Sequence, residues 1–136
     1  YNDSADDVQD IVRKLKVKTP HLQQQVVNLS GGNQQKVVLA KWLLTEPEVL
    51  IMDEPTRGVD VGAKAEIYQL ILQFAQAGKT VIINTLEIPE IRKVSDRCVV
   101  LYDGAVAKIF QHDEISEHSV MMYSTNAVAT AGKSEV

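Results

Sequence analysis

Cysteine is nearly absent from this chain: Cys98 is the single thiol among 136 residues, so no disulfide can form within it. A chain without internal disulfides is typical of a reducing compartment. No apolar run approaches the roughly 18 residues that a membrane-spanning helix needs. Basic residues are in the minority, because 14 Lys and Arg face 18 Asp and Glu, for a net charge of −4. The composition therefore gives no electrostatic indication of a nucleic-acid or anionic-membrane partner.

What the chain does contain is typical of a globular domain with a core, since 45% of its residues are hydrophobic and 24% are charged. Apolar residues at helical spacing alternate with short apolar runs. The pattern predicts helices after a cap at Asp3 or Ser4, over 31–44, 61–77 and 87–94, and from Asp113 to about 123, with strands over 49–52, 80–83, 98–102 and 105–110. Helices between apolar strands predict an α/β fold with a parallel sheet, in which ligands bind at the carboxyl ends of the strands.

Two acidic residues, Asp53 and Glu54, directly follow the apolar strand 49–52. Four apolar residues in a row are typical of a strand buried on both faces, which would hold the strand end rigidly. One carboxylate can hold Mg²⁺ through its water shell, while the other can orient an attacking water. The alternative is a solvated acidic turn, and these two residues alone do not decide between the interpretations.

A second polar cluster, Ser30-Gly31-Gly32, opens the predicted helix 31–44. Ser30 can cap the helix, and two glycines allow a phosphate to approach the backbone closely. The N–H groups and the positive helix end would then form an anion site. Taken alone, a simple capped helix after a turn is the better interpretation.

Taken in order, three segments resemble motifs of the ABC-type ATPases. Residues 29–36 (LSGGNQQK) resemble the signature motif, residues 50–56 (LIMDEPT) the Walker B motif with its catalytic glutamate, and residues 57–60 (RGVD) the D-loop. The similarity runs from about Thr19 to Tyr123. Residues 33–36, 56–64, 87–91 and 95–97 resemble, more narrowly, the second ATPase half of tandem monosaccharide importers of the ribose/galactose type.

The resemblance implies a P-loop NTPase-like α/β fold, with a parallel sheet flanked by helices and a short C-terminal β-hairpin and helix. It also implies two ATPase halves that enclose two ATP molecules, each between the P-loop of one half and the signature motif of the other. The site residues that it implies are Leu29, Ser30, Gly31, Gly32 and Gln35 beside the ATP of the partner half, Asp60 in the D-loop at the interface, Asp53 as a water-mediated Mg²⁺ ligand, and Glu54 as the catalytic group that polarises water.

Two departures from the family pattern matter. No P-loop is present, because Gly78-Lys79-Thr80 follows a helix and precedes a strand, the reverse of the P-loop order, so Gly78 is interpreted as a helix cap. The fold is therefore expected to be truncated, without the P-loop strand. Leu86 stands where the family has its switch histidine, and a leucine cannot donate a hydrogen bond to a phosphate. We expect the chain alone to be inactive and to bind neither ATP nor Mg²⁺ tightly.

The resemblance thus implies the C-terminal part of the ATP-binding subunit of a sugar-importing ABC transporter, cut from a longer chain because its first residue is Tyr1. The implied partners are the first ATPase half of the same polypeptide, the transmembrane permease and, indirectly, a periplasmic or extracellular sugar-binding protein, at the cytoplasmic face of a bacterial membrane. No nucleic-acid partner is expected. Two alternatives remain open: a non-transport ABC ATPase and a non-catalytic dimerisation module.

The expected division of the chain places residues 1–45 in the helical signature subdomain, 46–124 in the ATPase core and 125–136 in a flexible tail. We expect strands 80–83 and 98–102 to pair across the missing strand, or to exchange elements with a second copy in a homodimer. The remaining candidates are interpreted as structural: the histidines His21, His112 and His118 as surface residues, Cys98 as a buried apolar filler, Trp42 as packing, and Glu66 and Glu90 as solvated helix positions.

Overall fold

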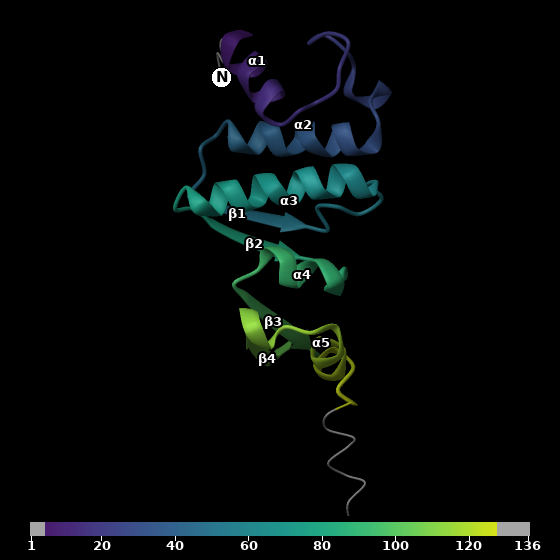
Figure 1. The fold of residues 1–136 in the computed structure, drawn as a ribbon, viewed down its shortest axis with the longest axis vertical. Helices are drawn as coiled ribbons and strands as arrows, with labels where there is room; N and C mark the ends of the chain where they lie inside the picture. Colours follow the sequence, from purple (N-terminus) through teal and green to yellow (C-terminus); the bar gives the residue numbers. More distant parts are fainter. Residues whose placement is uncertain (1–4, 128–136) are drawn as a thin grey trace, which may run out of the picture. The chain divides into compact units, whose positions relative to one another are not determined.

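The computed structural model describes residues 5–127 (Figure 1). The chain divides into two compact units, with the boundary between Asn84 and Thr85. The predicted division between residues 45 and 46 separates a helical subdomain from an ATPase core, and it stays a prediction. The predicted cap at Asp3 or Ser4 lies outside the described residues, and so does most of the predicted tail 125–136.

The first unit contains a two-stranded parallel sheet and three α-helices. Strands β1 (Val49–Asp53) and β2 (Thr80–Asn84) pair in register from Val49↔Thr80 to Asp53↔Asn84. The helices are α1 (Ala5–Lys14), α2 (Gly31–Leu43) and α3 (Val61–Gln76), and a 3-10 turn, η1 (Val26–Asn28), precedes α2. In Figure 1, α2 and α3 run side by side. The unit therefore stacks α1, α2 and α3 on one another and on the sheet.

Strand β1 is not buried on both faces, so that prediction is wrong. Leu50 is 6% exposed, but Ile51 is 72% exposed and Val49 is 51% exposed. Successive side chains of a strand point to opposite faces, so burial of Leu50 implies that Val49 and Ile51 lie on the other face. Within this unit the described helices cover one face of the sheet, and the apolar run therefore has one covered and one open face.

The helix ends follow local sequence signals. Ser30 caps α2 and Asp60 caps α3, each through its side-chain oxygen. Gly78 follows α3 with a φ of +88°, which confirms it as the residue that ends this helix. The predicted cap at Asp113 is wrong, because Asp113 lies in a short 3-10 turn, η2 (His112–Glu114). Helix α5 (Glu117–Ser124) begins later, and the Ser116 hydroxyl caps it.

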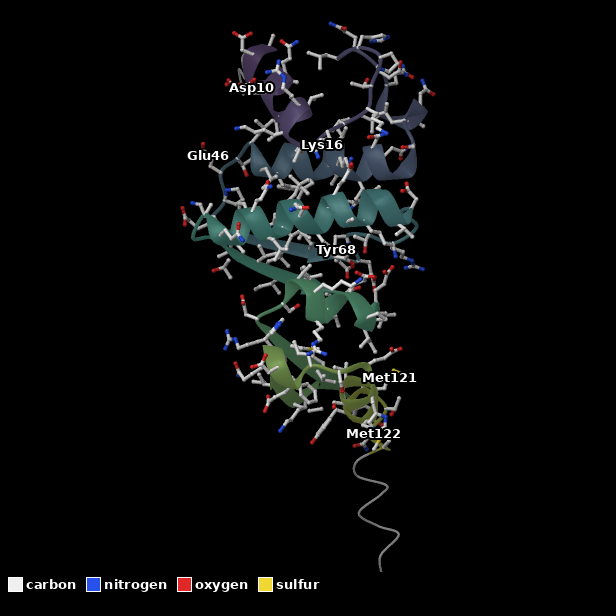
Figure 2. All side chains as sticks on the ribbon, viewed as in Figure 1. Asp10, Lys16, Glu46, Tyr68, Met121 and Met122 are labelled. Carbon is white, nitrogen blue, oxygen red and sulfur yellow. The ribbon has the colours of Figure 1, made fainter. Side chains whose placement is uncertain are left out.

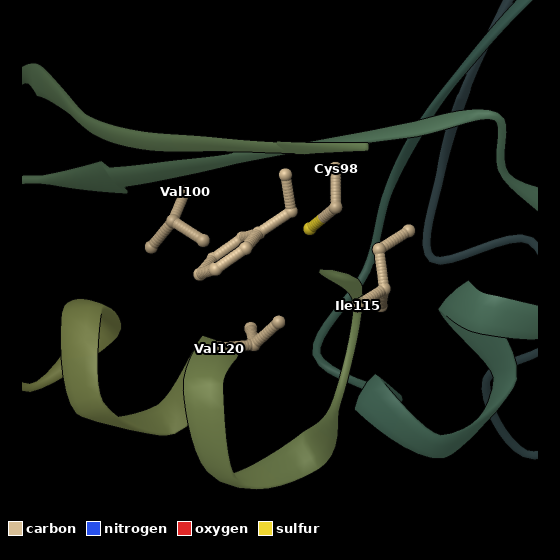
Figure 3. Close-up of a cluster of buried hydrophobic side chains, with 5 residues drawn as sticks. Cys98, Val100, Ile115 and Val120 are labelled. Atoms are coloured by element: carbon tan, nitrogen blue, oxygen red, sulfur yellow. The ribbon is translucent and has the colours of Figure 1, made fainter. Parts of the chain in front are cut away.

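The second unit is built on an antiparallel hairpin. Strands β3 (Arg97–Tyr102) and β4 (Ala105–Gln111) are joined at Asp103 and Gly104, whose φ values of +49° and +76° fit the predicted hairpin turn. Helix α4 (Ile88–Val94) precedes the hairpin and α5 follows it. One face of the hairpin packs with α5 around a buried cluster (Figure 3): Cys98, Val100, Phe110, Ile115 and Val120. The burial of Cys98 confirms it as a core residue, and this burial raises the pKa of its thiol.

Among the described residues, β2 pairs with β1 and β3 pairs with β4. The expected pairing of strands 80–83 and 98–102 would join the two units, and it stays a prediction, as does the alternative exchange of elements with a second copy. None of the described helices is long and apolar enough to cross a membrane.

Candidate functional site

Asp53 lies at the carboxyl end of β1, where the sequence pattern placed it. The amide of its register partner, Asn84, donates a hydrogen bond of 2.6 Å from Nδ2 to Asp53 Oδ1. The Asp53 side chain is exposed. A carboxylate can accept several hydrogen bonds or bind a hydrated cation, so this interaction orients Asp53 and leaves room for a water-mediated ligand.

Glu54 follows with a left-handed backbone, since its φ is +44°. The Glu54 N–H donates to the carbonyl of Asn84 over 2.8 Å, and the Glu54 carbonyl accepts from the N–H of Arg57 over 3.1 Å. These two bonds hold a conformation that residues with a Cβ adopt at some cost. The chain thus turns sharply directly after Asp53.

The start of α2 has the backbone donors that an anion site needs, and it is exposed at Gly31. Gly31 is exposed, and an ideal Cβ on it would have as its nearest neighbour the carbonyl oxygen of Gly58, at 3.8 Å. The first N–H groups of a helix have no partner within the helix, and the positive end of the helix dipole points the same way. The open position at Gly31 therefore fits a phosphate group that approaches the backbone.

Gly32 has a different surrounding. It is buried, and an ideal Cβ on it would lie 2.6 Å from the Cβ of Ala63 in α3. The same Cβ would lie 3.6 Å from Asp60 Oδ2. Gly32 thus allows α2 and α3 to pack closely, which gives this glycine a packing reason beside the predicted phosphate contact.

Loop 57–60 lies beside the start of α2. Its Gly58 carbonyl faces Gly31, and Asp60 Oδ1 accepts a hydrogen bond of 3.0 Å from the N–H of Ala63. Asp60 is exposed while it caps α3. The structure therefore brings the predicted residues Gly31, Gly32 and Asp60 together at one end of the helix pair α2–α3.

Two further predicted residues lie to either side of this point, Leu29 before α2 and Gln35 within it. Leu29 packs partly buried against the cluster of Leu15, Val17 and Ala40. Gln35 is half-buried and lines a groove of about 510 Å³ along α2 and β1, which Asp53 also lines. Trp42 lines the same groove and is 54% exposed, so it is not the packed residue that the sequence suggested.

A buried ion pair was missed at the sequence level. Lys36 is only 2% exposed, and its ammonium pairs with the carboxylate of Glu66 in α3. The Lys36 ammonium also donates to the backbone carbonyl of Lys16 over 3.2 Å. Lys16, which Figure 2 labels, lies in the turn after α1. The hydrogen bond from Lys36 lowers the pKa of Glu66. Glu66 is therefore not simply a solvated helix position. The only indication of this ion pair in the sequence is that Lys36 follows Gly32 by one helical turn.

The metal-binding capacity of the site is limited to carboxylates. Among the described residues, no group of three or more His, Cys, Asp and Glu side chains could hold a metal ion. The exposed Asp53 carboxylate provides an oxygen donor, which fits Mg²⁺ because this ion keeps several waters in its shell. Leu86, in the second unit, is 88% exposed and has no polar side-chain atom.

Comparison with known proteins gives one family. A family model described as ABC transporter matches residues 1–57. The galactose/methyl galactoside import ATP-binding protein of Clostridium tetani is 47% identical over 122 residues, which cover 90% of this chain and 24% of that protein. The ribose import ATP-binding protein of Clostridium perfringens is 47% identical over 119 residues, covering 88% and 24%. This chain thus spans about a quarter of the length of these relatives.

Solved structures give the same fold. A dimeric ATP-binding cassette with bound ADP and phosphate superposes with a TM-score of 0.70 at 25% identity, covering 82% of this chain and 51% of that one. A nucleotide-free ATP-binding cassette from an ABC transporter gives a TM-score of 0.74 at 23% identity, covering 87% and 48%. The α/β fold predicted from the sequence is therefore confirmed as part of an ATP-binding cassette.

Proposed function

We propose, from the premise that this chain belongs to the ABC-type ATPases, that it forms the C-terminal part of a nucleotide-binding domain that powers sugar import. The family binds ATP and Mg²⁺. The relatives are named as import ATP-binding proteins for ribose, galactose and methyl galactoside. The observation that carries the proposal is the open backbone at Gly31, beside the exposed loop 57–60. An open helix start at the surface can serve a nucleotide that another ATPase half holds.

Three residues at the start of α2 would bind the terminal phosphate of that nucleotide. Ser30 supplies a hydroxyl, and the backbone N–H groups of Gly31 and Gly32 supply donors at the positive end of the helix dipole. Leu29 fixes the backbone that leads into the helix, and Gln35 lies one turn further along α2. Asp60, which already caps α3, would meet the partner half across the interface and couple the two sites.

The second proposed site belongs to the same half and uses the strand end. Asp53, oriented by Asn84, would hold Mg²⁺ through its water shell, and Glu54 would polarise the attacking water. A bound Mg²⁺ ion neutralises charge on the phosphates. Leu86 offers no hydrogen-bond donor to a phosphate, so we propose that hydrolysis at this half's own site is slow.

The proposed partners follow from the same premise. They are another ATPase half, the first half of the same polypeptide, and a membrane permease at the cytoplasmic face of a bacterial membrane. A sugar-binding protein outside the membrane would act indirectly. By itself the chain would be inactive and would bind ATP and Mg²⁺ weakly, because it contributes half of each site.

The test uses the full-length ATP-binding subunit that carries this sequence, assembled with its permease in lipid vesicles. Gly31→Asp places a carboxylate where a phosphate would approach, so we expect ATP hydrolysis to fall by at least about tenfold. Glu54→Gln alters the slow site, so we expect less than about a threefold change. Equal effects of the two variants would contradict the proposed asymmetry. Hydrolysis that does not respond to the permease and the sugar-binding protein would contradict the role in import.

A further inference from the structure

Asn33 links the segment after α1 to the cap of α2. The backbone N–H of Lys18 donates to Asn33 Oδ1 over 2.9 Å. A backbone N–H can only donate, so the oxygen of the Asn33 amide must face Lys18. This contact fixes the orientation of the amide, whose nitrogen then points the other way.

The amide nitrogen of Asn33 reaches the hydroxyl of Ser30. Asn33 Nδ2 donates to Ser30 Oγ over 2.9 Å, and the backbone N–H of Asn33 donates to the same oxygen over 3.4 Å. A serine hydroxyl has two lone pairs and one proton. Both lone pairs of Ser30 are engaged by Asn33, so the hydroxyl proton must be offered to a different acceptor.

The geometry points to Asn33 as a positioning residue that presents the Ser30 hydroxyl as a donor to a phosphate oxygen at the start of α2. This inference rests on the proposed function of that site. Ser30 is exposed there, and a phosphate oxygen can only accept a hydrogen bond from it. If the amide were reversed, the Ser30 proton would be donated to Asn33, and lone pairs would face the anion. Lys18 therefore acts on the phosphate site through Asn33 and Ser30.

The segment that holds Asn33 is itself fixed. The carbonyl of Lys16, two residues before Lys18, accepts a hydrogen bond of 3.2 Å from the buried ammonium of Lys36. Lys36 and Asn33 lie on the same helix, about one turn apart. The N–H of Lys18 is thus held at a set position relative to α2, as a fixed amide orientation requires.

A double-mutant cycle in the full-length ATP-binding subunit, assembled with its permease, tests the inference. Because hydrogen bonds to charged groups are strong, we expect Ser30→Ala to lower kcat by about tenfold or more. We expect Asn33→Ala to lower kcat by about three- to tenfold, and to add less than about twofold in the Ser30→Ala background. This coupling arises because Asn33 acts through the hydroxyl that Ser30→Ala removes.

Gln34→Ala is the matched control. The Gln34 amide donates to the carbonyl of Leu29 over 2.9 Å, so it supports the same turn without engaging the Ser30 hydroxyl. In the double variant, the fold reductions in kcat caused by Gln34→Ala and by Ser30→Ala should multiply. If Asn33→Ala also multiplies with Ser30→Ala, or has no effect by itself, Asn33 has only a structural role and the inference is wrong. If Ser30→Ala itself leaves kcat unchanged, the proposed phosphate contact fails instead.

Discussion

The substitution Gly32→Ala tests how the start of α2 is packed, and Gly31→Ala is its neighbour and control. An ideal Cβ at Gly32 lies 2.6 Å from the Cβ of Ala63, roughly 1 Å closer than the ~3.5 Å at which carbon atoms make contact. The clash involves two Cβ atoms fixed to helix backbones, so α2 or α3 must move. At Gly31 the nearest atom lies at 3.8 Å, and nothing needs to move.

The two variants should change the free energy of unfolding differently. Overpacking costs about 1–3 kcal/mol, and replacing glycine by alanine in a helix returns up to about 1 kcal/mol. Gly32→Ala should therefore lower the free energy of unfolding of the first unit by about 1–2 kcal/mol. Gly31→Ala should leave it unchanged or raise it by up to about 1 kcal/mol.

The assay is urea unfolding followed by the fluorescence of Trp42, which is the single tryptophan of the chain and lies on α2. With a urea dependence of about 1–2 kcal/mol per molar, the two midpoints should differ by about 1 M. Coinciding midpoints, or a lower midpoint for Gly31→Ala, would refute the packing role of Gly32.

Two further pairs of substitutions test the buried ion pair and the open face of the sheet. Glu66→Gln should destabilise the first unit by about 3 kcal/mol because it leaves the buried ammonium of Lys36 without its counterion. Lys36→Met should cost less than about 1 kcal/mol because the side chain of Glu66 is 38% exposed and water can solvate its carboxylate. Urea unfolding that ranks the two variants in the opposite order would contradict this account. Because the pKa of Glu66 is lowered from its ordinary value of 4.5, its ion pair adds stability at pH values above 4.5, and this stability is lost as the pH falls below that value. In Glu66→Gln, the free energy of unfolding measured against pH should no longer show this loss. Leu50→Ala should cost about 2–5 kcal/mol and Ile51→Ala less than about 1 kcal/mol, and equal costs in the same assay would show that both faces of β1 are covered.

Local signals made most elements of the fold predictable. The caps at Ser30 and Asp60 and the stop at Gly78 each rest on contacts within a few residues, so the sequence contains them. Helix α5 shows where such signals compete, because Asp113 and Ser116 are both good caps. Ile115 is 1% exposed, and burying this side chain requires the extended backbone that delays the helix to Glu117.

Features that depend on contacts distant in sequence were not predictable. The apolar run of β1 shows that its residues tolerate burial, but which layers cover them depends on the helices present, and Ile51 remains exposed. Lys36 reads as a solvated lysine on a helix, because its partners lie 30 residues later at Glu66 and 20 residues earlier at Lys16. The link from Lys18 through Asn33 to Ser30 was missed because it needs a backbone group 15 residues from the motif.

The two adjacent glycines of α2 show why a match to a motif does not tell which residue has which role. Neighbouring residues on a helix point about 100° apart, so Gly31 and Gly32 cannot both face the same partner. A Cβ on Gly31 would meet only the Gly58 carbonyl oxygen, at an ordinary contact distance of 3.8 Å, whereas a Cβ on Gly32 would lie 2.6 Å from the Cβ of Ala63. A helix start that binds a phosphate and also packs against a second helix therefore needs small residues in two directions at once. The pair in sequence meets both needs, and substitution at one position should disturb ligand approach while substitution at the other disturbs folding.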